Sequence, residues 1–348
     1  MPRAPRLAMM TLPTLDHFTG DLLAHLPAAS GWEVRKFHLT SPATLGEALA
    51  WTDEPRDAIW FEFCWPPFPA LIGATDFGGR RVIVRVHRIE ATETPHVANT
   101  PWDKVDDVIV VVSPDMRRRV RAAAPEIELT SRLHLICNGV DTGRFVPAGE
   151  RNSFRIGWCG LMTLRKNPTL ALQILARLRA VDARWHLSLC GMGGEPLAHE
   201  TFVHLAGRLG LRDAISWEGR IGQSGMPRWH AANAVLLHTS LHEGLSYAVL
   251  EAAASGCDLV VFDHPGAAEC WPAEVLFGTV EEAVDLIRAA RPARWRDYVR
   301  ARYSLDRQIA EVAAVLNDGV RRDAIAPLSA CASAVRRTGE LADANGVV

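Results

Sequence analysis

Two glutamates flank a short turn late in the chain, and their spacing is the strongest chemical signal in the sequence. The turn is Gly244-Leu245-Ser246, and it lies between Glu243 and Glu251. Gly244 permits a sharp bend that exposes backbone amides, and Ser246 is expected to cap the helix that follows. Because a helix start offers unpaired N–H groups and the positive end of the helix dipole, this turn is predicted to bind an anion.

The two carboxylates cannot bind that anion, but they can bind hydroxyl groups beside it. Glu251 lies inside the predicted helix, which rises about 1.5 Å per residue, so it can reach hydroxyls next to the anion. An anion with hydroxyls on both sides is the description of a nucleotide diphosphate sugar. The alternative is an ordinary strand-helix-strand unit in which Glu243 and Glu251 are solvated surface charges.

A second glycine turn, at Gly160, follows a predicted strand and precedes Arg165 and Lys166 at the start of another helix. A diphosphate carries about two negative charges, and charge-assisted hydrogen bonds contribute roughly 1.5 to 3 kcal/mol each. One lysine and a few amides can therefore hold it without a metal ion, and the sequence contains no D-x-D triplet to bind one. The alternative for Lys166 is a surface lysine, which the helix dipole disfavours.

His87 ends the predicted strand 81–87, at the carboxyl edge where open α/β sheets place their ligands. A histidine there can bind a sugar hydroxyl or stabilise charge that develops in the transition state. The alternative is a histidine whose ring is satisfied within its own loop. Glu90 and Arg88, which lie just after His87, are weaker candidates for the same site. The basic run 117–121 is interpreted as the solvated face of a helix.

Composition restricts the class of protein. The 348 residues are 48% hydrophobic and 22% charged, which suits two globular domains. The net charge of −2 implies no general attraction to nucleic acid. Seven scattered cysteines without C-x-x-C spacing favour a reducing cytoplasm. Since no run approaches the roughly 18 apolar residues of a membrane span, membrane contact is expected to be at most peripheral, at the inner face.

Short apolar runs alternate with helical patterns, which is typical of parallel sheets covered by helices on both faces. The predicted strands are 7–12, 33–39, 58–63, 81–87, 107–113, 133–137, 155–159, 185–190, 215–218, 234–237 and 258–262. The predicted helices include 18–26, 115–124, 168–180, 197–209, 226–232 and 306–316. Residues 138–152 are rich in Gly, Asp, Asn and Pro and indicate a linker. The fold class is therefore α/β, with two doubly wound Rossmann-like domains facing a central cleft.

These motifs resemble the donor site of family 4 glycosyltransferases. The resemblance is carried by E-G-L-S at 243–246 with Glu251, and by N-G-V-D at 138–141 in the linker. It implies a retaining enzyme of the GT-B fold. Leu161 departs from the family pattern, since an arginine that contacts the diphosphate is expected there, and Arg165 is the candidate to replace it.

The resemblance also implies a domain plan. The N-terminal acceptor-side domain is predicted over 1–146 and the nucleotide-sugar donor domain over 147–304. A helix over 305–323 is expected to return to the first domain, as in other GT-B proteins. The Ala- and Ser-rich tail, 324–348, is expected to be flexible.

Roles follow residue by residue where positions match the family, whereas Asp16 and His17 stand in the loop after Leu12 where the family commonly has paired glycines. His87 and Glu243 are predicted to act at the transferred sugar, and Asp16, His17 and Glu90 on the acceptor side. No metal or other cofactor is expected. The predicted donor-binding residues are Gly160, Arg165, Lys166, Gly191, Arg220, Gly244, Leu245, Ser246 and Glu251.

The expected activity is that of a metal-independent, hexosyltransferase-type enzyme. Its donor would be a UDP- or GDP-sugar, and its acceptor a hydroxyl of a glycan, a lipid-linked glycan or a small natural product. A glycoside hydrolase would also use two carboxylates, but Lys166 and two helix starts argue for a diphosphate. A non-catalytic nucleotide-sugar-binding partner subunit stays open, because loss of the arginine at Leu161 is a change that such a protein would show.

Overall fold

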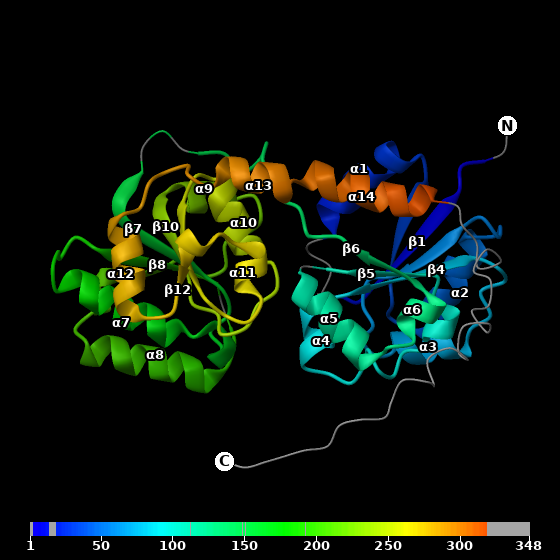
Figure 1. Cartoon of the computed structure of the whole chain (residues 1–348), viewed down its shortest axis with the longest axis horizontal. Helices are drawn as coiled ribbons and strands as arrows, with labels where there is room; N and C mark the ends of the chain where they lie inside the picture. Colours follow the sequence, from blue (N-terminus) through cyan, green and yellow to red (C-terminus); the bar gives the residue numbers. More distant parts are fainter. Residues whose placement is uncertain are drawn as a thin grey trace, which may run out of the picture. The chain divides into compact units, whose positions relative to one another are not determined.

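The computed structural model describes residues 3–13, 19–111, 113–147, 149, 151–191 and 193–318. In this part of the chain, two six-stranded parallel sheets are covered by helices on both faces (Figure 1). The strands are β1 (Arg6–Thr11), β2 (Glu33–His38), β3 (Ala58–Phe61), β4 (Arg81–Val86), β5 (Asp107–Val110), β6 (Arg132–Leu135), β7 (Asn152–Cys159), β8 (His186–Cys190), β9 (Ile215–Trp217), β10 (Asn233–His238), β11 (Asp258–Phe262) and β12 (Leu276–Phe277).

The helices between them are mostly short. They are α1 (Gly20–Ser30), α2 (Pro42–Trp51), α3 (Phe68–Ala74), α4 (Arg88–Thr92), α5 (Pro114–Ala123), α6 (Ile127–Thr130), α7 (Pro168–Arg179), α8 (Pro196–Arg208), α9 (Met226–Ala231), α10 (Tyr247–Ala254), α11 (Ala267–Cys270), α12 (Val280–Arg288), α13 (Arg296–Arg302) and α14 (Leu305–Asn317). Single 3-10 turns are η1 (Trp102–Lys104), η2 (Leu164–Lys166), η3 (Arg212–Ala214) and η4 (Ala273–Val275).

The first sheet has the strand order β2-β1-β3-β4-β5-β6. Its central strands are buried on both faces, so alternate residues enter different cores. Leu7 and Met9 of β1 pack with apolar residues of α1 and α14, whereas Ala8 and Met10 lie in the core on the opposite face. Figure 1 shows α14 beside α1, although the two helices lie far apart in the sequence.

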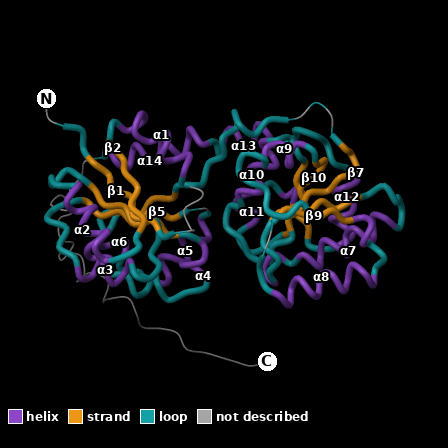
Figure 2. The backbone as a smooth tube through the Cα atoms, turned by 180° about the vertical axis from the view of Figure 1, so that it is seen from behind, coloured by secondary structure: helices purple, strands orange, loops and turns teal. Residues whose placement is uncertain are grey.

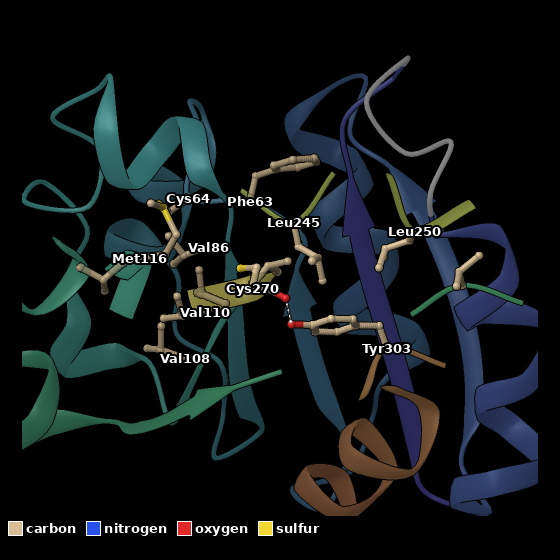
Figure 3. Close-up of a cluster of buried hydrophobic side chains, with 14 of the residues drawn as sticks. Phe63, Cys64, Val86, Val108, Val110, Met116, Leu245, Leu250, Cys270 and Tyr303 are labelled. Carbon is tan, nitrogen blue, oxygen red and sulfur yellow. Dashed lines mark hydrogen bonds between the residues drawn. The ribbon is translucent and has the colours of Figure 1, made fainter. Parts of the chain in front are cut away.

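The second sheet has the order β12-β11-β10-β7-β8-β9. Helices α7, α8 and α12 form a layer on one face, and α9, α10 and α13 lie together on the other (Figure 2). One buried apolar cluster contains residues of both halves of the chain, as the labelled side chains of Figure 3 show. In that cluster Phe63 and Val86 follow or end strands of the first sheet, and Leu245 and Leu250 belong to the stretch around α10.

The predicted fold class is confirmed: both sheets are parallel and are connected through helices. Each of the eleven predicted strands overlaps an observed one, with ends that differ by a few residues. Strand β12 was not predicted, and neither were the short helices α2, α3, α4, α6 and α11. The predicted domain boundaries stay a prediction. The predicted helix start at Phe18, residues 319–323 of the return helix and the tail 324–348 lie outside the described residues.

Candidate functional site

Glu243 is the centre of the candidate site, in the loop between β10 and α10. Its Oε2 atom lies 2.5 Å from Lys166 Nζ and 2.9 Å from a guanidinium nitrogen of Arg165. Arg88, which begins α4 beside the first sheet, places its Nε 3.7 Å from the other carboxylate oxygen. The carboxylate is only 14% exposed. Three cations, two from η2 and one from α4, therefore surround one largely buried carboxylate.

The charge of Glu243 is fixed by these neighbours. Burial alone would raise the pKa of its carboxyl, but the charges of Lys166 and Arg165 outweigh that effect and hold the pKa well below its usual range. The carboxylate is therefore ionised at neutral pH. Since one negative charge faces three positive ones, this cluster retains surplus positive charge and is suited to an anion.

Three histidines lie around the same carboxylate. His238 Nε2 lies 4.0 Å from Glu243 Oε2, and the rings of His238 and His242 both face the ring of His264. Burial lowers the pKa of His238 to about 3, with Lys166 adding to the shift. Burial also lowers the pKa of His242 and His264. The three rings are therefore neutral at pH 7 and add no positive charge to the site.

The glycine turns that follow β7 and β8 lie in direct contact. The amide of Gly160 donates to Cys190 O at 3.0 Å, and a Cβ on Gly191, whose φ is +134°, would lie 2.0 Å from Gly160 O. Likewise, a Cβ on Gly194 would lie 2.1 Å from Met162 O. Gly191 and Gly194 are thus required for close approach of two backbones. This contact positions the loop that carries Arg165 and Lys166.

The turn before α10 differs from its prediction in one respect. Ser246 is the residue before the helix, but its side chain makes no capping hydrogen bond, so the predicted cap is wrong. Its backbone, at φ −69° and ψ 122°, is extended, and its carbonyl instead accepts the amides of Val249 and Leu250 at 3.1 Å. Leu245 is buried in the apolar cluster of Figure 3, which leaves only its backbone as a possible donor contact.

Glu251 lies inside α10, and its carboxylate contacts the ring of His230. Its Oε2 atom is 3.2 Å from His230 Nε2, and its side chain is 15% exposed. His230 is fully buried and its Nδ1 makes no hydrogen bond. The pair fixes the direction of the Glu251 carboxylate, whose other oxygen can accept hydroxyl groups.

His87 belongs to a buried polar network that begins at the end of β3. Its Nε2 lies 3.0 Å from the carbonyl oxygen of Glu62 and 3.2 Å from its carboxylate. Arg85 and Trp60 both donate to the same carboxylate, at 2.8 Å. Burial lowers the pKa of His87 despite this partner, so the ring is neutral at pH 7. Arg85 also donates to Asn138, the first residue of the predicted linker motif, at 2.5 Å.

Sequence reasoning missed Glu62 and Arg85. Both interrupt predicted strands that are otherwise mostly apolar, and each is at most 2% exposed. A charged residue inside a buried strand requires a charged or hydrogen-bonding partner. Two such residues on neighbouring strands were therefore the signal that could have found this network.

The remaining predicted residues are scattered around these two networks. Glu90 is 1% exposed and accepts the amide hydrogen of His87 at 2.6 Å. Its carboxyl group therefore stabilises the start of α4. Burial raises the pKa of Glu90 to about 8. Arg220 lies exposed in the loop after β9. Asp16 and His17 lie outside the described residues.

The described residues contain neither a metal-binding cluster nor a membrane-spanning helix. No group of three or more His, Cys, Asp or Glu side chains there could hold a metal ion. None of the described helices is long and apolar enough to cross a membrane.

One known family is similar to much of the second half of the chain. Residues 153–291 match the family model described as Glycosyl transferases group 1. The match runs from β7 to just past α12 and so contains Arg165, Lys166 and Glu243. No curated protein matches the sequence significantly.

Solved structures with the same fold extend the likeness to both sheets. Anabaena HepE in complex with UDP and glucose is 16% identical, with a TM-score of 0.71 over 90% of this chain and 99% of HepE. Sucrose-phosphate synthase from Thermosynechococcus elongatus is 15% identical, with a TM-score of 0.70 over 90% and 98% of the two chains. A glycosyltransferase from Rickettsia africae is 12% identical, with a TM-score of 0.66 over 92% and 100%. The likeness shows the GT-B fold.

Proposed function

We propose that this protein is a retaining, hexosyltransferase-type glycosyltransferase of family 4 that transfers a sugar from a nucleotide diphosphate sugar to a hydroxyl group without a metal ion. The observation that carries the proposal is the convergence of Arg165 and Lys166 on Glu243, beside the glycine turns at the carboxyl ends of β7 and β8. Surplus positive charge suits a diphosphate, and the buried carboxylate suits the hydroxyls of a sugar.

A UDP-sugar is the donor to test first. The Anabaena HepE structures contain UDP, glucose or UDP-glucose. A GDP-sugar is the alternative, because the predicted base contacts around Arg220 are mainly with the backbone and leave little trace in the side chains. The acceptor is a hydroxyl of a glycan, a lipid-linked glycan or a small natural product.

Each part of the donor has an assigned partner. Lys166, Arg165 and the amides at 244–246 bind the diphosphate, and Glu251 binds the ribose hydroxyls. Glu243 binds hydroxyls of the transferred sugar, and His87 faces that sugar from the first sheet. Because His87 is neutral at pH 7, it brings no charge to that sugar.

The reaction is an exchange of one bond at the anomeric carbon. The acceptor oxygen forms a bond to that carbon while the bond to the diphosphate oxygen breaks. The nucleoside diphosphate leaves, and the acceptor proton passes to its departing phosphate oxygen. Attack from the side of the leaving group retains the configuration, and the cations stabilise the charge that develops on the diphosphate.

Nucleotide release from UDP- and GDP-sugars tests the proposal, with acceptor mixtures analysed by mass spectrometry. Lys166→Ala should lower the rate about 10- to 100-fold, the value of one charge-assisted hydrogen bond. Arg177→Ala is the matched control, because Arg177 is an exposed cation on α7 that lies 3.6 Å from Glu281, away from the candidate site. EDTA should leave the rate unchanged, and NMR of the product should show the anomeric configuration of the donor.

Two results would contradict parts of the proposal. A rate that EDTA abolishes and manganese restores would overturn metal independence. If nucleotides bind but no sugar is released or transferred with any donor, the chain is a nucleotide-sugar-binding partner subunit, and Leu161 in place of the expected arginine would be consistent with it.

The proposed location is the cytoplasm, with peripheral attachment to the inner face of the membrane. Fractionation of the native host cells checks it.

A further inference from the structure

Arg88 joins the site from the opposite sheet. It is the first residue of α4, directly after His87, and its side chain is 12% exposed. Within the first half of the chain it contacts Thr92, the last residue of α4, and Glu93, which follows it. Across from the first sheet it reaches the loop after β10, where one guanidinium nitrogen lies 3.3 Å from His242 Nδ1 and Nε lies 3.7 Å from Glu243 Oε1.

These contacts leave the positive charge of Arg88 only partly compensated. Glu93 is 46% exposed, so water screens that pair. A distance of 3.7 Å to Glu243 is too long for a hydrogen bond. His242 is neutral at pH 7, because burial and then the charge of Arg88 lower its pKa. The guanidinium therefore has weak, exchangeable partners in the second half of the site.

Positive charges outnumber the negative charge around Glu243. Arg165 and Lys166 lie within hydrogen-bonding distance of one carboxylate oxygen, and Arg88 lies 3.7 Å from the other. An anion placed among the three cations can accept from all of them, and a planar guanidinium is well suited to two phosphate oxygens. Leu161, where the resemblance leads us to expect an arginine, is 52% exposed and can supply no charge.

We propose that Arg88 binds the diphosphate of the donor from the side of the first sheet, together with Arg165 and Lys166, and supplies the cation that is missing at Leu161. This inference rests on the proposed donor site. It makes Arg88 a binding residue of the reaction and ties nucleotide binding to contact between the two halves of the chain.

The simpler alternative is that Arg88 only fastens the two halves together. Arg118 on α5 provides the comparison, because it also crosses between them and lies 2.5 Å from Glu269 of α11. Arg118 does not reach Glu243. Arg118→Ala is therefore the matched control that removes a crossing contact and keeps the three cations of the site.

Calorimetric titration with UDP, uridine and pyrophosphate separates the two roles. Arg88→Ala should weaken UDP and pyrophosphate binding about 10- to 100-fold, as expected for one charge-assisted contact. Uridine affinity should stay the same. Arg88→Lys should recover part of the loss, since it keeps the charge without the planar fork. Arg118→Ala should leave the affinity ratio of UDP to uridine unchanged.

A second variant tests the replacement itself. Leu161→Arg introduced into Arg88→Ala should restore much of the UDP affinity, because it returns a cation to the same anion. Circular dichroism and the melting temperature verify that each variant is folded. If the parent binds neither UDP nor GDP, the proposed donor site fails and this inference fails with it. If the parent binds UDP and Arg88→Ala and Arg88→Lys bind it equally well, the role of Arg88 is overturned and the proposed function stands.

Discussion

Two buried carboxylates, Glu62 near the end of β3 and Glu243 after β10, are held ionised in similar surroundings but with different partners. Glu62 accepts from Trp60 of β3, from Arg85 of β4 and from His87, which directly follows β4. Glu243 is held by Lys166 and Arg165 of η2 and by Arg88 of α4, which come from different halves of the chain.

The difference indicates which network is structural and which is available to a ligand. The Glu62 carboxylate is fully buried and both of its oxygens are hydrogen-bonded within the first half of the chain. The Glu243 carboxylate has an excess of cations around it, and Arg165 among them is 31% exposed. A network with matched partners fixes a side chain, whereas a network with surplus charge can rearrange around an anion.

The largest effect is expected at Glu62. Glu62→Ala leaves Arg85, which is 3% exposed at its side chain, without its counter-ion. Loss of one partner from a buried pair costs about 3 to 5 kcal/mol of folding free energy. Urea denaturation should show this loss, and Glu62→Gln, which keeps an acceptor, should lose less. Equal stability of Glu62→Ala and the parent would show that the two carboxylates do not differ in the way described.

A third buried carboxyl, Glu90, sharpens the comparison because it has no cation beside it. Burial raises the pKa of Glu90 to about 8. The folded state therefore holds a proton that the unfolded state releases near pH 4.5, so this contribution to stability is complete below about pH 4.5 and is lost as the pH rises to about 8. Relative to the parent, the free energy of unfolding of Glu90→Gln should therefore increase by about 3 kcal/mol as the pH rises from 5 to 8. The melting temperatures of both proteins across this range test the prediction, and parallel curves would refute it.

Glu243→Gln should have the smallest effect on folding but opposite effects on turnover and on nucleotide affinity. Turnover should fall about 10- to 100-fold, because the sugar loses a charged acceptor. UDP should bind more tightly, because Lys166 and Arg165 no longer have a competing carboxylate. Steady-state rates and calorimetry measure the two quantities. Weaker UDP binding would mean that the carboxylate positions the cations and does not compete with the ligand.

Most of the fold could be predicted from the sequence because parallel strands buried on both faces are continuous apolar runs. The strands β4 and β10 are clear examples, with four or more apolar residues each. Strand β12 has only two residues, which is too short for any periodicity. Helices such as α4 and α6 have one turn or little more, so their existence depends on tertiary contacts and not on local propensity.

The candidate site could be predicted in part. The sequence suggested Lys166, Arg165 and Glu243 separately, and the structure places them in one cluster. It did not suggest that Glu243 would form ion pairs with both cations, since ion pairs between distant segments depend on the packing of the sheets. The capping role of Ser246 failed for a related reason, because the extended backbone before α10 directs its carbonyl, and not its hydroxyl, toward the helix.

The position of α14 affects how the chain folds during synthesis. Leu305, Ile309 and Val312 pack on Leu7 and Met9 of β1, and Arg81 donates to the last carbonyls of the helix. One face of the first sheet is therefore completed only after the ribosome has made the second sheet. At about 5 to 20 residues per second, the strands that end at Leu135 wait roughly 10 to 40 seconds for this helix. During that time Leu7 and Met9 lack the part of their apolar cover that α14 supplies.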